Sequence, residues 1–127
     1  MGALGAMSYD LVFWRQLPDL SLSPVEITRQ LCEQEQQVDG LVELPVGEIV
    51  REVEAAFPNI TTDGGLTYWE GGDDGMFEIY TSSQHVHFCC RQLLTDHCNT
   101  LIEILNRFEC PLYDPQVDER FGPAGGS

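Results

Sequence analysis

The segment from residue 66 to residue 90 is the part of this 127-residue chain that most constrains its fold. It contains three short runs rich in aromatic and β-branched residues, a composition typical of strands. The runs are separated by GGDDG at residues 71–75 and by TSSQ at residues 81–84. Connections this short join antiparallel neighbours, so the pattern predicts a three-stranded meander over residues 66–70, 76–80 and 85–90.

A further strand is predicted near the start of the chain, over residues 9–15 with the sequence YDLVFWR. Leu11 and Phe13 point to one side of such a strand, whereas Val12 and Trp14 point to the other. Because both sides are apolar, we expect an interior strand with a covered surface on each face. A last short strand is expected to begin at residues 112–113.

Three helices are predicted from caps and apolar periodicity. Ser23 and Glu26 form a capping box with Pro24 at the first helical position, which predicts a helix over residues 23–37. Residues 46–57 and 94–108 each carry an apolar stripe at three- and four-residue steps, and Pro58 and Pro111 follow their ends. These segments therefore predict two amphipathic helices.

The predicted order of elements is β-α-α-β-β-β-α-β, without the alternation of a parallel sheet. We expect an α+β fold with a single antiparallel sheet and helices packed mainly on one face. The length suits one domain, predicted over residues 8–121. Residues 1–7 are expected to be a disordered leader or a cloning scar, and residues 122–127 a flexible tail.

Charge limits the classes of partner. The chain has 21 Asp and Glu but only 6 basic residues, all Arg, for a formal net charge of −15. This charge disfavours nucleic acids and anionic membranes as direct ligands and favours a basic protein partner. No run approaches the ~20 apolar residues of a membrane span. The five cysteines are odd in number, which favours reduced thiols and a cytoplasmic localisation.

The acidic residues are interleaved with aromatic ones between Arg51 and Arg91, where no basic residue except His occurs. Aromatic side chains supply contact area at interfaces, and carboxylates steer a basic partner. We therefore expect a partner-binding surface. The alternative is that the aromatic side chains belong to the core and the acids form a solvated face. The expected contacts are Trp69, Glu70, Asp73 and Asp74, followed by Tyr68, Asp63, Glu52 and Glu54.

A second hypothesis is a small metal- or ligand-binding regulatory domain. His85, His87 and Cys89 alternate along a predicted strand and share one face. Imidazole and thiolate are zinc ligands, and His97 on the next helix could complete the set. The alternative is that the histidines lie on a half-solvated face, since no close-spaced ligand pair typical of structural zinc is present.

Few features of the sequence support nucleophilic catalysis by a cysteine thiol. Cys89 or Cys98 can be paired with His87 or His97, but no feature of the sequence orients a base against a thiol. Cys98 also lies on the apolar stripe of the third predicted helix, which favours burial. We therefore expect a non-enzymatic protein without a cofactor.

Both ends of the chain resemble a known group of proteins. Residues 8–14 (SYDLVFW) and 110–116 (CPLYDPQ), the latter after a helix ending in NRF at 106–108, resemble small acidic bacterial proteins of toxin–immunity loci. The resemblance implies an immunity protein that binds and neutralises a secreted toxin domain. It covers segments expected to form the fold and assigns no site residue. Toxin domains that degrade nucleic acid are basic, which agrees with an acidic inhibitor.

Overall fold

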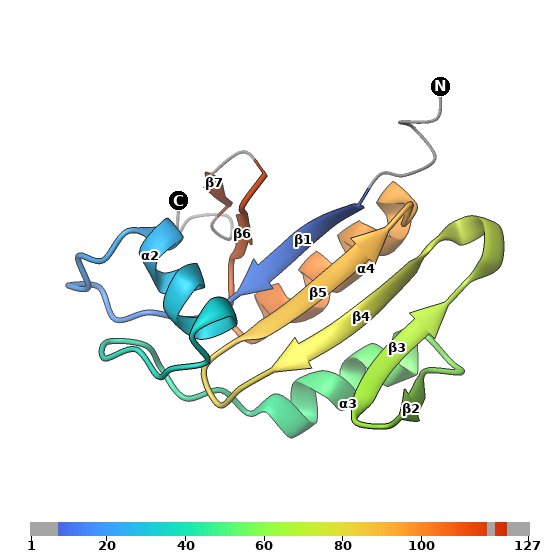
Figure 1. The fold of residues 1–127 in the computed structure, drawn as a ribbon, viewed down its shortest axis with the longest axis horizontal. Helices are drawn as coiled ribbons and strands as arrows, with labels where there is room; N and C mark the ends of the chain where they lie inside the picture. The colour runs from blue at the N-terminus through green and yellow to red at the C-terminus, as the bar shows by residue number, and fades with distance from the viewer. Residues whose placement is uncertain (1–7, 117–118, 122–127) are drawn as a thin grey trace.

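The computed structural model describes residues 8–116 and 119–121. The predicted leader at 1–7 and tail at 122–127 lie outside the described residues. A single antiparallel sheet of seven strands has the order β2-β3-β4-β5-β1-β6-β7 (Figure 1). The elements are β1 (Ser8–Phe13), α2 (Pro24–Thr28), a π-helical turn η1 (Arg29–Glu33), α3 (Val46–Ala56), β2 (Thr61–Asp63), β3 (Leu66–Glu70), a 3-10 turn η2 (Gly72–Asp74), β4 (Met76–Thr81), β5 (Val86–Arg91), α4 (Thr95–Arg107), β6 (Leu112–Asp114) and β7 (Glu119–Phe121).

The α+β fold with one antiparallel sheet is confirmed. The meander is the row β3-β4-β5, and its strands begin and end within one residue of the predicted limits. Strand β1 is an interior strand, as expected, because β5 and β6 flank it. Two strands were not expected, β2 and β7, and each is only three residues long.

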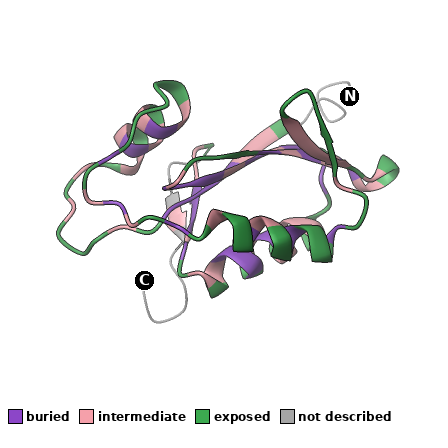
Figure 2. Cartoon of the chain, turned by 90° about the horizontal axis from the view of Figure 1, so that it is seen from below, coloured by how far each residue is buried: buried purple, intermediate pink, exposed green. Residues whose placement is uncertain are grey.

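The main core lies between one face of the sheet and the two long helices, α3 and α4. Phe13, Phe77 and Phe88 are fully buried on this face. Ile49 of α3 and Leu101 of α4 meet them from the helices. Figure 2 shows both long helices on the same side of the sheet. Burial of this apolar surface is the main source of stability for the fold.

A smaller core covers one end of the opposite face. Val12 and Trp14 of the β1 segment pack there with Tyr113, and α2 and η1 contribute Ile27 and Leu31. The Trp14 and Tyr113 rings lie 5.5 Å apart. The two apolar sides of β1 therefore serve two separate cores, one on each face of the sheet.

The predicted helix over residues 23–37 is wrong in its length. Its cap is as expected, because the Glu26 backbone N–H donates to Ser23 Oγ at 3.2 Å. However, α2 ends at Thr28, η1 ends at Glu33, and Glu35 has a positive φ of 51°. The chain turns back here to place Val38 and Leu41 against the small core, a tertiary demand that outweighs helix propensity.

The short helical segment leaves much of this sheet face without a helix over it. We call the surface formed by β2, β3, β4 and β5 side chains that point away from α3 and α4 the open sheet face. By strand register, its members are Thr61, Asp63, Leu66, Tyr68, Glu70, Met76, Glu78, Tyr80, His87, Cys89 and Arg91. Asp10 of β1 continues this face next to Cys89.

Candidate functional site

The structure divides the eight expected partner contacts among three places. Asp63, Tyr68 and Glu70 share the open sheet face. Glu52 and Glu54 are exposed on α3, which packs on the other side of the sheet. The remaining three residues, Trp69, Asp73 and Asp74, lie around the β3–β4 connection. One flat interface therefore cannot include all eight residues.

Trp69 is half-buried and packs on the helix side of the sheet. Its indole is stacked on Phe77 at 5.6 Å and meets the Phe57 and His97 rings at 5.1 and 5.3 Å. It also covers Gly71, where an added Cβ would lie 2.2 Å from the indole. Trp69 therefore serves the core, the alternative that the sequence left open for the aromatic residues, and is not a protruding anchor.

Asp74 has a structural role at the start of α4. His97 Nε2 lies 3.2 Å from Asp74 Oδ2, and the Leu94 backbone N–H donates to the Asp74 carbonyl at 3.1 Å. These contacts fix the β3–β4 connection against the helix. Asp73 beside it is exposed. The two adjacent acids thus differ, since only the Asp73 side chain faces solvent fully.

The sequence prediction missed two members of the open sheet face, Glu78 and Tyr80. The Tyr80 hydroxyl donates to Glu78 Oε1 at 2.8 Å, and Tyr80 is 43% exposed. Alternation along β4 was the available signal, since Glu78 and Tyr80 alternate with the buried residues Phe77 and Ile79. Together with Asp63, Tyr68 and Glu70, they make the open sheet face both acidic and aromatic.

The predicted metal set of His85, His87, Cys89 and His97 is not assembled as proposed. His85 precedes β5 and is buried, with its Nδ1 at 2.7 Å from Ser82 Oγ. Burial lowers the pKa of His85 to about 4, so the ring is neutral. His97 lies on the opposite side of the sheet against Phe57. Neither residue belongs to the group of donor atoms around His87 and Cys89, although His85 lines the same cleft as these two.

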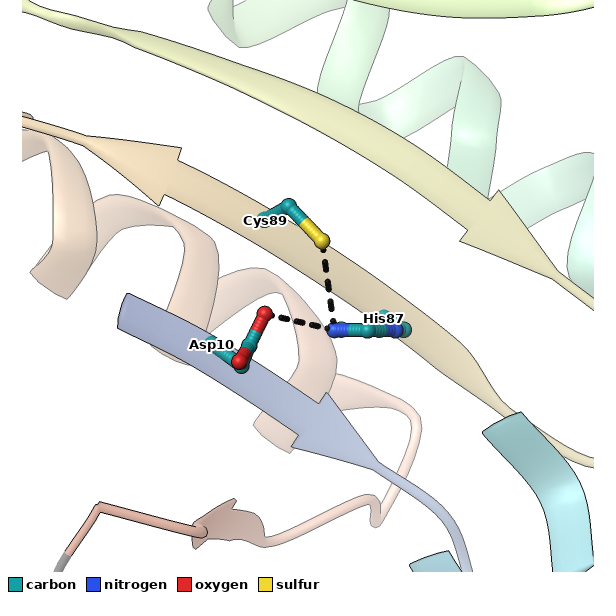
Figure 3. A group of neighbouring side chains, drawn as sticks. All are labelled: Asp10, His87 and Cys89. Atoms are coloured by element: carbon teal, nitrogen blue, oxygen red, sulfur yellow. Dashed lines mark hydrogen bonds and ion pairs between the residues drawn. The ribbon is translucent and has the colours of Figure 1, made fainter. Parts of the chain in front are cut away.

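Asp10 takes their place beside His87 and Cys89. His87 Nε2 lies 3.0 Å from Asp10 Oδ1 and 3.4 Å from Cys89 Sγ (Figure 3). Within the described residues, these three donor atoms lie within 4.8 Å of one another. In the sheet, Asp10 pairs directly with Cys89. No local pattern could identify Asp10, because it lies 77 positions before His87 and the β1–β5 pairing is a tertiary contact.

The surroundings hold a positive charge on His87. Burial alone would lower its pKa, but hydrogen bonds to Asp10 and to the Cys32 and Cys89 thiols outweigh burial and raise the pKa to about 11. The same hydrogen bond from His87 lowers the pKa of Asp10. The cluster is therefore an ion pair with neighbouring thiols.

The geometry of this cluster does not match a catalytic triad. In a triad, the carboxylate and the nucleophile contact different nitrogens of the imidazole. Here Asp10 and Cys89 both approach Nε2 of His87. The arrangement instead directs three donor atoms toward a common point.

A cleft of about 800 Å³ opens beside the cluster. It lies between the η1 segment and the ends of β4 and β5, and its walls include Cys32, Tyr80, His87 and Cys89. The other thiols lie elsewhere. Cys90 and Cys110 are buried, and burial raises the pKa of Cys110 to about 11. Only Cys32 and Cys89 therefore belong to the cleft.

Comparison with protein-family models, with curated proteins and with solved structures finds no match to this chain. Among the described residues, no helix has the length and apolar character needed to cross a membrane. The functional argument therefore rests on the open sheet face and on the cluster at its margin.

Proposed function

We propose that this protein is an immunity-type inhibitor that binds and neutralises a basic bacterial toxin domain, of the nuclease class, through its open sheet face. The observation that carries the proposal is the composition of that face. The carboxylates of Asp63, Glu70 and Glu78 lie around the tyrosines Tyr68 and Tyr80. The same face also carries the arginine Arg91. A surface of this kind is complementary to a basic partner.

The tyrosines supply what charge alone cannot. Tyr80 is 43% exposed, and Tyr68 lies beside Glu78 on the adjacent strand. Tyrosine offers a large apolar ring with a polar hydroxyl and loses little conformational freedom on binding. The rings therefore give contact area, while the carboxylates orient the partner.

The acidic face also favours fast capture of a toxin. Clustered charge of one sign raises association rates by about 10–10³-fold when the partner has the opposite charge. A nuclease domain carries a cationic groove for phosphates, and carboxylates can occupy such a groove. Inhibition then requires no chemical step, so the proposal describes a non-enzymatic protein.

Two further observations support this reading. The β1 and β6 segments, which carry the resemblance to immunity proteins, pack together at the centre of the small core. All five cysteines are free, as expected for a protein that acts in the reducing cytoplasm of the producing cell.

The test uses the toxin domain encoded by the neighbouring reading frame, purified and mixed with this protein. We expect a stable complex whose association slows at high salt. The double variant Glu70→Lys, Glu78→Lys should slow association at least about 10-fold and reduce its salt dependence, as stopped-flow fluorescence would measure.

The matched control is Glu48→Lys, Glu54→Lys, which makes the same change of charge on α3, where both residues are exposed. Its association rate should stay close to that of the unchanged protein. The proposal is contradicted if the control slows association as much as the sheet variant does. It is equally contradicted if no neighbouring frame encodes a toxin domain that binds.

A further inference from the structure

The side chains of Asp10, His87 and Cys89 offer an oxygen, a nitrogen and a sulfur donor that converge on one point (Figure 3). Imidazole nitrogen, thiolate sulfur and carboxylate oxygen are the three kinds of donor that zinc accepts. We propose that these three residues form a zinc site whose fourth coordination position is open to solvent. Its ligands His87 and Cys89 lie on the open sheet face, but zinc binding requires no partner and can be tested without one.

The distances between the donor atoms suit a tetrahedral ion. Bonds of 2.0–2.3 Å to zinc place a nitrogen and an oxygen about 3.4 Å apart, and a nitrogen and a sulfur about 3.6 Å apart. The corresponding separations are 3.0 Å between His87 and Asp10 and 3.4 Å between His87 and Cys89. Both separations are within a few tenths of an ångström of the tetrahedral values, and the third pair, Asp10 and Cys89, lies within 4.8 Å.

The backbone holds the donors firmly. His87 and Cys89 alternate on β5, and Asp10 faces Cys89 across the β1–β5 pairing near the middle of the sheet. The Asp10 backbone is further fixed by Gln116, whose side chain accepts from its N–H at 2.7 Å and donates to its carbonyl at 3.2 Å. Sites built on paired strands are more precise than sites built on loops.

The three donor groups lie in contact with one another. Both Asp10 and Cys89 approach Nε2 of His87, yet one ring nitrogen carries a single proton. A zinc ion placed between the three groups would satisfy all of them at once. Zinc would bind the deprotonated forms of these groups and displace their protons.

The site is partly accessible, as an ion-binding site must be. The side chains of His87 and Asp10 are 16% and 44% exposed, and the cleft borders His87 and Cys89. Cys32 lies in the same cleft, but its sulfur is outside the group of donor atoms that lie within 4.8 Å of one another. Three protein ligands and one open position are typical of accessible zinc sites.

The test is a metal titration of the purified full chain, without any partner, after treatment with a chelator. We expect one Zn²⁺ per chain in competition with a chromophoric chelator. Bound Co²⁺ should show tetrahedral d–d bands and a thiolate charge-transfer band. Cys89→Ser should abolish the charge-transfer band and weaken zinc binding at least about 100-fold, and Asp10→Asn should weaken it at least about 10-fold.

The other side of the sheet provides matched controls. His97 also lies beside a carboxylate, with 3.2 Å between its Nε2 and Asp74 Oδ2. Cys98 is a half-buried thiol that is hydrogen-bonded to the Tyr9 hydroxyl. His97→Asn and Cys98→Ser should bind zinc as the unchanged protein does. Circular dichroism would confirm that every variant is folded.

Three outcomes overturn the proposal. They are no stoichiometric binding at micromolar zinc, unchanged affinity in folded Cys89→Ser, and a loss of affinity in Cys98→Ser equal to that in Cys89→Ser. Because no partner enters the titration, these outcomes leave the inhibitor proposal unaffected. Conversely, failure to bind a toxin domain does not bear on the metal site.

Discussion

At the scale of single residues, both the backbone conformation and the neighbouring atoms require a glycine at position 75. Its φ is +94°, and an added Cβ would lie 2.3 Å from the Gln92 carbonyl oxygen. We predict that Gly75→Ala lowers the free energy of unfolding by at least about 2 kcal/mol, because it combines a disfavoured conformation with a steric clash. Urea denaturation followed by circular dichroism measures the loss.

Gly47 is the control for this change, because it lies in α3 and an added Cβ would meet nothing within 4 Å. Gly47→Ala should raise the free energy of unfolding by about 0.5 kcal/mol through helix propensity. If both substitutions have the same effect, the turn at Gly75 is not formed as described.

Single residues also show where sequence reasoning reaches its limit. Alternation along a strand was enough to place His87 and Cys89 on one face, and this prediction is confirmed. The same alternation did not reveal that the strand begins at Val86, which leaves His85 buried against Ser82. Asp10 joined the cluster only through long-range strand pairing, which a single sequence does not encode locally.

At the scale of elements, α2 and η1 depend on packing. Five residues of α helix are too few to be stable alone, so these turns persist because they cover Trp14. Leu31 is 3% exposed in this core. We predict that Leu31→Ala lowers the free energy of unfolding by about 2–4 kcal/mol, as measured by urea denaturation.

Val25 lies on the same segment but is 44% exposed. Val25→Ala should change stability by less than about 0.5 kcal/mol, the usual range for a surface site. A small effect of Leu31→Ala would mean that the segment is not docked on the sheet, and the smaller core would then need revision.

The elements that were predicted well and badly differ in their local signals. Helices α3 and α4 have long apolar stripes, and the structure ends each within one residue of the predicted limit. Strand β2 is three exposed residues, Thr61–Asp63, without an apolar pattern to reveal it. Helix α2 ends early because the residues that follow it pack in the small core. This packing is a contact between distant segments and leaves no local pattern in the sequence.

At the scale of the whole molecule, the fold class followed from the order of elements, whereas the placement of charge did not. Periodicity could not tell that Glu54 and Glu70 lie on opposite sides of one sheet. The net charge of −15 is nevertheless a property of the whole chain, and it opposes the compact state through self-repulsion.

Salt should therefore stabilise this protein. The arginine–carboxylate pairs of the described residues, Arg15–Glu109, Arg29–Glu26 and Arg107–Glu52, are partly or largely exposed and contribute little that salt could remove. We predict that Tm rises by a few degrees between about 10 mM and about 300 mM NaCl, because screening weakens repulsion among the excess carboxylates. Scanning calorimetry in the presence of a chelator measures this change without a contribution from bound metal.

The double variant Glu70→Gln, Glu78→Gln tests whether the open sheet face contributes to this repulsion. Because it removes two charges that lie on adjacent strands, it should raise Tm at low salt and flatten the salt dependence. KCl should act as NaCl does, since screening depends on ionic strength rather than on ion identity. A Tm that falls with salt would mean that attractive ion pairs outweigh the repulsion among carboxylates. The carboxylates of the acidic face would then be paired within the protein and not available to a basic partner.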